Sequence, residues 1–536
     1  MGTEEAATTL PRDTYHVPRP TPRVYAAVAA TIVGVWVVVM QVRLTGYALA
    51  DIIGALGSSP DEAAWVNTTY IVTELLSIPI AGWLCARIST RRVFVPAAIA
   101  FTLATLAATQ VTNINQLIYL RAVQGFTGGA FIPIAAPTFQ RTLPYRHRLG
   151  ALALYGIASS VPISLAPLIE SYFVDFVSWR WLFVPSALLS AIAAALAAWG
   201  MPVVPFDRQA RWIPDWGGTL LMPVGLGFMV MGIDQANRLD WFDSPWVVGM
   251  LVAGALSLLA FLEHEREHPT PYLSLRLLTN RNFVIAVVTY LAFFASMIAI
   301  VWALPEFLRR VEDFRPSDYI DIFVAMIVPQ LLVPFFVVRA SRRLDLRLVV
   351  AAGVAVQAIA CLRTATITSE WAAPELIEIF ALHGLGQGLF FTPIFVMLTL
   401  NIADADRPAA AAVVNLTRVF GNAVGVSVAS TLVTQAEHLH HNMLDEYLHA
   451  DGFGAGARLD SLRDLVVAYR GSDENGKRAL ALAGRALRRE AFVLAYGDLF
   501  LTIGVVLLVC LVLLTLAGPI SLDELRARRL PVRRST

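Results

Sequence analysis

Fourteen long apolar segments, spread from Val24 to Gly518, constrain this chain more than any other feature of its sequence. A bilayer core about 30 Å thick needs about 20 mostly apolar residues per helix. Lipid offers no hydrogen-bond partner to a bare backbone, so each segment is predicted to be an α-helix. The predicted spans are 24–46, 63–85, 93–110, 117–139, 149–172, 181–201, 216–234, 245–262, 282–308, 319–338, 348–364, 374–400, 408–436 and 494–518. The sequence therefore predicts an all-α integral membrane protein with fourteen transmembrane helices.

The composition agrees with this class and excludes others. Hydrophobic residues make up 57% of the chain, charged residues 15%, and the net charge is +1, which gives no electrostatic case for a nucleic-acid partner. The three cysteines form no CxxC pair, and no phosphate-binding GxxxxGK[ST] loop is present. His438, His440 and His441 cluster beside the thirteenth span, and we interpret them as a solvated helix end. We expect no enzyme, no cofactor and no metal site.

The distribution of arginine predicts how the chain threads the membrane. With the N-terminus placed in the cytoplasm, the inside segments carry 24 arginines and the short outside loops carry six. This asymmetry follows the positive-inside rule, so the tails 1–23 and 519–536 are both expected in the cytoplasm. The long segment 437–493 is then extracytoplasmic, and short amphipathic helices are predicted near 456–470 and 477–492.

Weak internal similarities indicate a duplicated chain. Three matches occur in the same order at nearly the same offset: RISTRRV at 87–93 with RLDLRLV at 343–349, Gln124-Gly125 with Gln387-Gly388, and Arg148 and the helix after it with Arg407 and its helix. Parallel repeats of this kind occur in transporter folds that hold a central site between two halves. The predicted domains are an N-terminal six-helix bundle at 24–203, a linker with two inserted helices at 204–276, and a C-terminal six-helix bundle at 277–518.

Five motifs in a fixed order carry a resemblance to one family. They are GWLCARISTRRVF (82–94), LIYLRAVQGFTGGAFIP (117–133), PISLAPLIESYFVDFVSWRWLF (162–183), NLTRVFGNAVGVSVAST (415–431) and AFVLAYGDLF (491–500). As a set they resemble the major facilitator superfamily (MFS), in its fourteen-helix drug:proton antiporter branch that includes EmrB-like pumps. The resemblance implies an MFS fold of two pseudo-symmetric six-helix bundles plus two inserted helices. It also implies export of amphipathic organic compounds by proton antiport across the inner membrane, with a periplasmic adaptor and an outer-membrane channel as partners.

The motifs also depart from the family pattern. Ala86 stands where the loop motif usually has an acid, and Ala166 and Glu170 replace glycines of the fifth-helix motif. In the first span, Gln41 or Arg43 falls where the family carries an aspartate. These changes leave the fold prediction intact and keep two alternatives open. One is a dedicated metabolite or lipid transporter with altered coupling, and the other is a non-transporting membrane scaffold or sensor.

Charged residues at membrane depth are costly, which makes them functional candidates. Glu74 lies about eleven residues into the second span, about 16 Å deep, and is a candidate proton carrier. The alternative is a structural ion pair with Arg43 or Arg121. Arg121 shares a helix face with Gln124. The family resemblance makes Arg121 a coupling residue, and the alternative is a salt bridge that holds two helices together.

The remaining candidates divide into coupling and substrate-binding residues. Arg43 and Glu170 lie near outer helix ends and are weaker proton-coupling candidates, and Glu170 could replace the acid missing from the first span. Arg418, in the middle of the thirteenth span, could attract an anionic substrate or take His383 and Gln387 as polar neighbours. The predicted substrate-binding residues are Gln41, Gln124, Tyr155, His383, Gln387 and Arg418.

Overall fold

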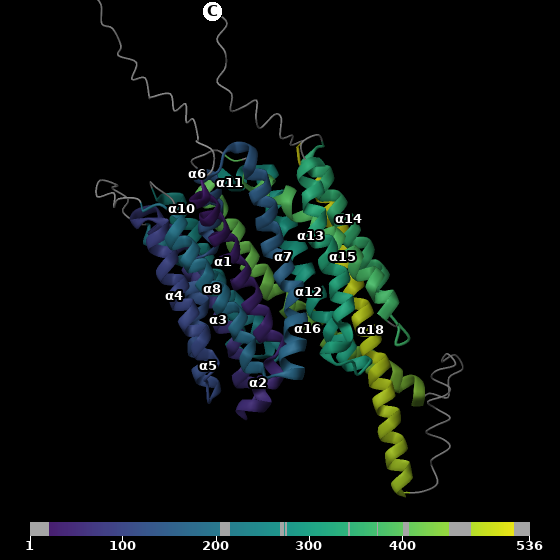
Figure 1. Ribbon diagram of the computed structural model, residues 1–536. Helices are drawn as coiled ribbons and strands as arrows, with labels where there is room; N and C mark the ends of the chain where they lie inside the picture. Colours follow the sequence, from purple (N-terminus) through teal and green to yellow (C-terminus); the bar gives the residue numbers. More distant parts are fainter. Residues whose placement is uncertain are drawn as a thin grey trace, which may run out of the picture.

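The computed structural model is all-helical in the part of the chain that it describes (Figure 1). That part comprises residues 21–203, 215–268, 273, 276–340, 344–371, 373–399, 402, 407–449 and 473–518. The first half contains α1 (Pro22–Tyr47), α2 (Leu49–Leu56), α3 (Pro60–Ile88), α4 (Thr90–Ala108), α5 (Ile114–Gly129), α6 (Ile132–Thr142), α7 (Tyr145–Phe176), the 3-10 turn η1 (Trp179–Leu182) and α8 (Phe183–Gly200). The inserted pair follows as α9 (Trp216–Ala236), η2 (Trp241–Asp243) and α10 (Pro245–Glu267).

The second half begins after the inserted pair. Its elements are α11 (Arg276–Thr279), α12 (Arg281–Val311), η3 (Pro316–Tyr319), α13 (Ile320–Ala340), α14 (Leu346–Thr364), α15 (Ala373–Thr399), α16 (Arg407–His449) and α18 (Asp473–Thr515). Among the described residues, fourteen helical stretches are long and apolar enough to cross a membrane, which confirms the predicted number of spans. An even number of crossings places Pro22 and Gly518 at the same end of the bundle.

Local sequence signals account for the helix boundaries. Ser59 caps α3 by accepting a hydrogen bond from the Glu62 N–H, and the Glu62 carboxylate accepts one from the Ser59 N–H in return. The fourth span is broken between α5 and α6, and Pro133 lies in the first turn of α6. A proline has no N–H to donate, so it fits the first helical turn, where such groups have no partner within the helix.

The two halves repeat one packing pattern, as the internal similarities predict. In the first half α1 packs on α7 and α8, α3 packs on α5, and α4 packs on α8. In the second half α12 packs in the same way on α16 and α18, α13 on α15, and α14 on α18. These matched pairs are the pseudo-symmetric bundles of the predicted fold class.

Glycines allow the closest helix contacts in both halves. A Cβ atom on Gly125 would lie 2.2 Å from the Tyr70 carbonyl oxygen, so α5 meets the backbone of α3 there. In the second half a Cβ on Gly384 would lie 2.1 Å from the Met326 carbonyl oxygen, between α15 and α13. Small residues permit this approach between membrane helices, whose association depends on close packing.

Gly125→Ala is therefore expected to destabilise the protein by about 1–3 kcal/mol, because the added methyl group forces α3 and α5 apart. The effect is measured as the midpoint of thermal unfolding in mild detergent, with the folded fraction monitored by size-exclusion chromatography. Gly82→Ala is the matched control, since a Cβ on Gly82 in α3 would meet nothing within 4 Å. Equal unfolding midpoints for the two variants would contradict the close contact.

The inserted helices form a pair on the side of the bundle and touch both halves. α9 and α10 pack on each other, and α9 also packs on α3 and α16. At the end opposite Pro22, Asn237 donates a hydrogen bond to the Thr434 hydroxyl (3.3 Å), and the Trp241 indole donates one to the Thr431 hydroxyl (3.2 Å). The pair is thus held to the second half as well as to the first.

Two helices are longer than predicted. α16 continues past residue 436 to His449, and α18 begins at Asp473, so the predicted separate helix at 477–492 is wrong and belongs to α18. Polar pairs stabilise this extension, among them Arg488 with Glu437 (3.2 Å) and His440 with Asp498 (2.7 Å). The predicted helix at 456–470 lies outside the described residues. Figure 1 shows α18 projecting beyond the rest of the bundle.

Candidate functional site

A buried ion pair joins the two halves at mid-membrane depth. The Arg418 guanidinium of α16 donates from Nη2 to Oε1 of Glu74 in α3 at 2.5 Å, and the two side chains are 6% and 2% exposed. The predicted alternatives that pair Glu74 with Arg43 or Arg121 are therefore wrong for this conformation. Removing one partner from such a pair leaves an uncompensated buried charge, so the two charges constrain how the halves sit together.

Arg121 and Gln124 come together, as their spacing on one helix face predicts. Arg121 donates hydrogen bonds to the Val66 carbonyl (3.3 Å) and to the Gln124 side chain (3.1 Å), and its guanidinium lies 4.0 Å from the centre of the Tyr70 ring. Gln124 in turn donates to the Thr105 hydroxyl (3.1 Å). The described residues place no carboxylate within ion-pair distance of Arg121, so the salt bridge that was its alternative role is not formed here.

A cavity of about 620 Å³ lies between the halves at the end opposite Pro22 and Gly518. Its walls come from the far ends of α1, α7, α9 and α12, from α2, and from the middle of α3 and α16. Five carboxylates and two guanidinium groups line it: Asp51, Glu170, Asp175, Asp234, Glu306, Arg43 and Arg309. The cavity is therefore richer in acidic than in basic side chains.

The ion pair lies just beyond the lining of this cavity. Ile71 lines the cavity and lies three residues before Glu74 on α3. Asn422 also lines it and lies four residues after Arg418 on α16. Residues three and four apart share a helix face. The Glu74–Arg418 pair is therefore about one helical turn deeper than the cavity wall, on the same two helices.

Arg43 and Glu170 line the same cavity, although neither pairs with the other. The Arg43 side chain is buried, and its Nη2 atom has no hydrogen-bond partner in the described part of the chain. Beside it, the Tyr47 hydroxyl donates to the Val301 carbonyl at 2.8 Å, which links α1 to α12 across the two halves. Arg43 thus presents an unsatisfied donor at the cavity wall.

Asp234 is a cavity carboxylate that the sequence reading missed. It lies in the last turn of α9, where the hydroxyls of Thr68 in α3 and Ser427 in α16 donate to its two oxygens, the second at 3.5 Å. The seventh span is predicted to end at residue 234, and an acidic residue at the end of a span is not by itself a candidate for function. The structure instead makes it a link between the inserted pair and both halves.

The interface is packed on the other side of the ion pair. The Tyr155 hydroxyl of α7 donates to Asn415 of α16 at 3.2 Å, and its ring meets Phe395 of α15 at 4.9 Å between centroids. Further along, the Gln330 amide donates to Ser164 (2.9 Å) and to Gln387 (2.5 Å). Tyr155 and Gln330 therefore join the two halves, whereas Gln387 bonds within the second half, and neither Tyr155 nor Gln387 lines the cavity.

Two other predicted residues lie away from the cavity lining. Gln41 donates weakly to the Thr45 hydroxyl (3.4 Å), and its Oε1 atom is buried without a donor among the described residues. His383 is fully buried, with its ring 6.1 Å from that of Phe380 and both nitrogens unpartnered in the described part. The prediction that Arg418 takes His383 and Gln387 as neighbours is wrong, because its partner is Glu74.

Within the described part of the chain, metal-ligating residues converge at a place that the sequence does not predict. Of the predicted outer histidines, His440 pairs with Asp498 and His438 lies 3.9 Å from Glu437. Asp215, His264 and His268 instead form a compact group at the other end of the inserted pair. Their signal was present in the chain, because residues 264–268 read His-Glu-Arg-Glu-His, an H-E-x-x-H sequence.

Comparisons with known proteins agree with this architecture. Residues 31–425 match the Major Facilitator Superfamily. The multidrug export protein EmrB of Escherichia coli K12 is 25% identical over 494 residues, which cover 90% of this chain and 93% of EmrB. The fatty acid resistance protein FarB of Neisseria gonorrhoeae is 26% identical over 488 residues, which cover 90% and 94% of the two chains. A bacterial homologue of the human lysosomal transporter Spinster shares the fold, with a TM-score of 0.51 and 12% identity over 92% of this chain and 96% of its own.

Proposed function

Because this chain belongs to the Major Facilitator Superfamily, we propose that it is a secondary transporter that exports amphipathic organic compounds in exchange for protons. The observation that carries the proposal is the cavity between the halves, which lies one helical turn above a buried ion pair that bridges them. By their names, EmrB exports multiple drugs and FarB confers resistance to fatty acids. Both names fit substrates with an apolar body and a polar or charged end.

The ion pair supports a coupling mechanism. A proton on Glu74 neutralises the partner of Arg418 and weakens the attraction between α3 and α16. The halves can then rock apart on the packed side, in alternating access about the central site. Release of that proton on the other side restores the pair and returns the halves. Arg121, Arg43 and Glu170 are the secondary residues of this coupling.

The charge of the cavity supports a preference among substrates. Five carboxylates face two guanidinium groups, so a lipophilic cation is favoured over an anion of the same size. Apolar lining residues such as Ile71, Trp302 and Val426 accommodate the hydrophobic body. The guanidinium groups of Arg309 and of Arg43, with its unsatisfied Nη2, favour an anionic head group, and with it the alternative of a dedicated lipid transporter.

We place the protein in the inner membrane with both termini in the cytoplasm. In that orientation the cavity opens to the periplasm, and the projecting end of α18 extends into the periplasm (Figure 1). This projection is where a periplasmic adaptor, and through it an outer-membrane channel, would dock. Polar and charged pairs such as Arg488–Glu437 are suited to a water-exposed contact of this kind.

Growth of a host stripped of its own efflux pumps tests the proposal. The wild type is expected to protect against lipophilic cations more than against organic acids, and Glu74→Gln is expected to remove the protection at equal membrane levels. Glu378→Gln is the matched control, because it neutralises a glutamate that is 61% exposed in an ion pair with Arg363.

Each other outcome of this experiment counts against a stated part of the proposal. Protection that survives Glu74→Gln would remove this residue from the coupling step. Protection that survives a protonophore would exclude proton antiport and favour the alternative with altered coupling. No protection from any compound would favour a dedicated substrate or a non-transporting scaffold.

A further inference from the structure

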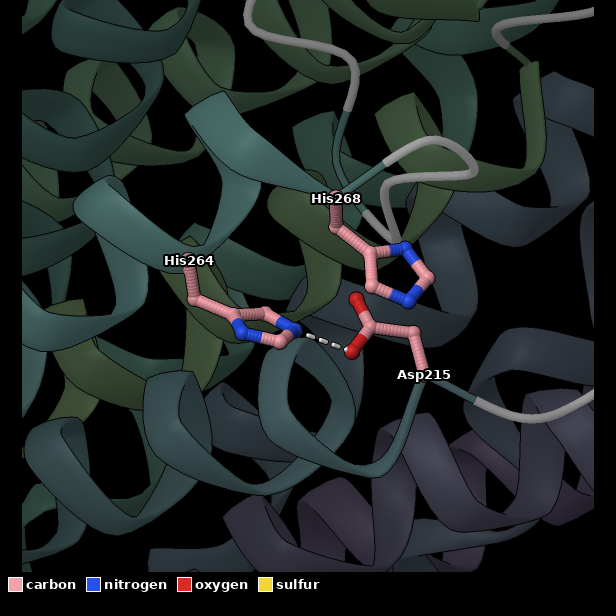
Figure 2. A group of neighbouring side chains, drawn as sticks. All are labelled: Asp215, His264 and His268. Carbon is pink, nitrogen blue, oxygen red and sulfur yellow. Dashed lines mark hydrogen bonds and ion pairs between the residues drawn. The ribbon is translucent and has the colours of Figure 1, made fainter.

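Three potential metal ligands converge where the inserted helices begin and end (Figure 2). Asp215 is the N-cap of α9, His264 lies in the last turn of α10, and His268 follows at its C-cap. One ligand atom from each lies within 4.8 Å of the others, and the His264 Nε2 atom is 2.5 Å from Oδ1 of Asp215. Figure 2 shows both imidazole rings turned toward the Asp215 carboxylate. The i, i+4 spacing explains how one helix end supplies two ligands.

The aspartate has an oxygen that the described residues leave unsatisfied. Its side chain is only 5% exposed, and Oδ2 is buried without a hydrogen-bond donor there. Its other oxygen, Oδ1, accepts a hydrogen bond from the Gly218 N–H at 2.8 Å and contacts His264 Nε2. A buried carboxylate oxygen without a partner is costly, and a cation beside it would remove that cost.

Close packing fixes the first imidazole in place. A Cβ atom on Gly217 would lie 2.6 Å from Cε1 and 2.7 Å from Nε2 of His264, so the first turn of α9 presses against this ring. The Ser257 hydroxyl also donates to the Leu221 carbonyl at 2.9 Å, which ties α10 to α9 further along. Ligands held by rigid elements need little reorganisation on binding.

We propose that Asp215, His264 and His268 bind a divalent first-row transition-metal ion, with Zn²⁺ as the reference case. Two imidazoles and one carboxylate suit zinc, which takes nitrogen and oxygen ligands at about 2.0–2.2 Å in tetrahedral geometry. Calcium and magnesium prefer all-oxygen sites and are disfavoured by two imidazoles. Tetrahedral ligands lie about 3.4 Å apart, so on binding the 2.5 Å contact between His264 Nε2 and Asp215 Oδ1 lengthens by about 1 Å, and ligand atoms that lie up to 4.8 Å apart move closer together.

The bound ion would have a structural role rather than a hydrolytic one. In an H-E-x-x-H metalloprotease the glutamate is the general base. Here the corresponding residue, Glu265, is 3% exposed and accepts a hydrogen bond from the Leu273 N–H at 2.8 Å. The ion would instead join the start of α9 to the end of α10. Next to the proposed site, the ring centroids of Trp216 in α9 and Trp83 in α3 lie 5.3 Å apart. The bound ion would therefore also stabilise the contact between the inserted pair and the first half.

Zinc titration of the purified full-length protein, prepared without a histidine tag, tests the site. A chromogenic zinc chelator serves as competitor, and Co²⁺ absorption reports the coordination geometry. We expect one Zn²⁺ per chain, with at least tenfold weaker binding in Asp215→Asn, in His264→Ala and in His268→Ala, each checked for folding by size-exclusion chromatography. The triple variant His438→Ala/His440→Ala/His441→Ala should keep the site and its tetrahedral Co²⁺ spectrum.

A pair of glycine variants separates ligation from general stability. Gly217→Ala pushes the His264 ring away and should weaken zinc binding, whereas Gly249→Ala in α10 should leave it unchanged, because its Cβ would meet nothing within 4 Å. His268→Ala keeps the test valid if the other variants fold poorly. Unchanged zinc affinity in His268→Ala and Asp215→Asn would overturn the proposal, as would loss of all binding in the outer triple variant.

Discussion

Glu74→Gln is expected to destabilise the protein by about 3–5 kcal/mol, and Arg418→Gln by much less, although both break the same ion pair. The two side chains are 2% and 6% exposed, so whichever charge remains is left in an apolar interior. A guanidinium is never deprotonated in a protein, so Arg418 stays charged when its partner is replaced. A carboxyl group left alone can take up a proton and become neutral. Thermal unfolding of both single variants in mild detergent measures the difference.

The double variant Glu74→Gln/Arg418→Gln completes this test. It should recover most of the stability lost in Glu74→Gln, because no buried charge remains, and it should not recover proton-driven export. This separation of stability from transport distinguishes a coupling pair from a purely structural one. Equal destabilisation by the two single variants would contradict the proposed asymmetry, and export by the double variant would show that the pair is dispensable for coupling.

The sequence predicted the fold well because its strongest signal is local. Each span is a continuous apolar segment, and all fourteen recur as helical stretches, of which the fourth is broken between α5 and α6. The duplicated Gln-Gly dipeptides also marked a real contact, since Gly125 and Gly388 each allow a close approach to the helix on which they pack, α3 and α13 respectively. Helix lengths were less predictable, because α16 and α18 continue into polar sequence. Polar side chains of the two helices pair with each other there, as Glu437 does with Arg488.

The arrangement of the site was not predictable from such local signals. Glu74 and Arg418 each stood out as a charge at membrane depth, but they are 344 residues apart, and their pairing depends on how the halves meet. Asp234 was missed because it lies at the end of an apolar segment, where an acid is ordinary. His264 and His268 lie in the polar sequence just past the predicted end of their span, and Asp215 joins them only when α9 folds back on α10.

Asp234→Asn is expected to reduce the export of lipophilic cations by about tenfold or more, which corresponds to about 1.4 kcal/mol, and to leave neutral substrates almost unchanged. Asp234 is one of five carboxylates that line the cavity, and it receives hydrogen bonds from α3 and α16. Asparagine has the same size, and its carbonyl oxygen can accept from one hydroxyl while its amide NH2 donates to the other, so the variant removes the charge and can keep both contacts. Efflux of a cationic and a neutral fluorescent dye from the same cells measures the two effects.

Asp61→Asn is the control that separates the effect of a charge in the cavity from the effect of a charge elsewhere at the same end of the molecule. Asp61 lies at the same end of the molecule, where its 69% exposed side chain pairs with Arg238 at 2.9 Å, and it does not line the cavity. A surface pair of this kind contributes little, so both dyes should leave cells at the wild-type rate. If Asp234→Asn slowed both dyes equally, the residue would be structural, because only a contact with the charge of the substrate can discriminate between dyes of similar size. Unchanged export of the cationic dye would show instead that the acidic lining does not select cations.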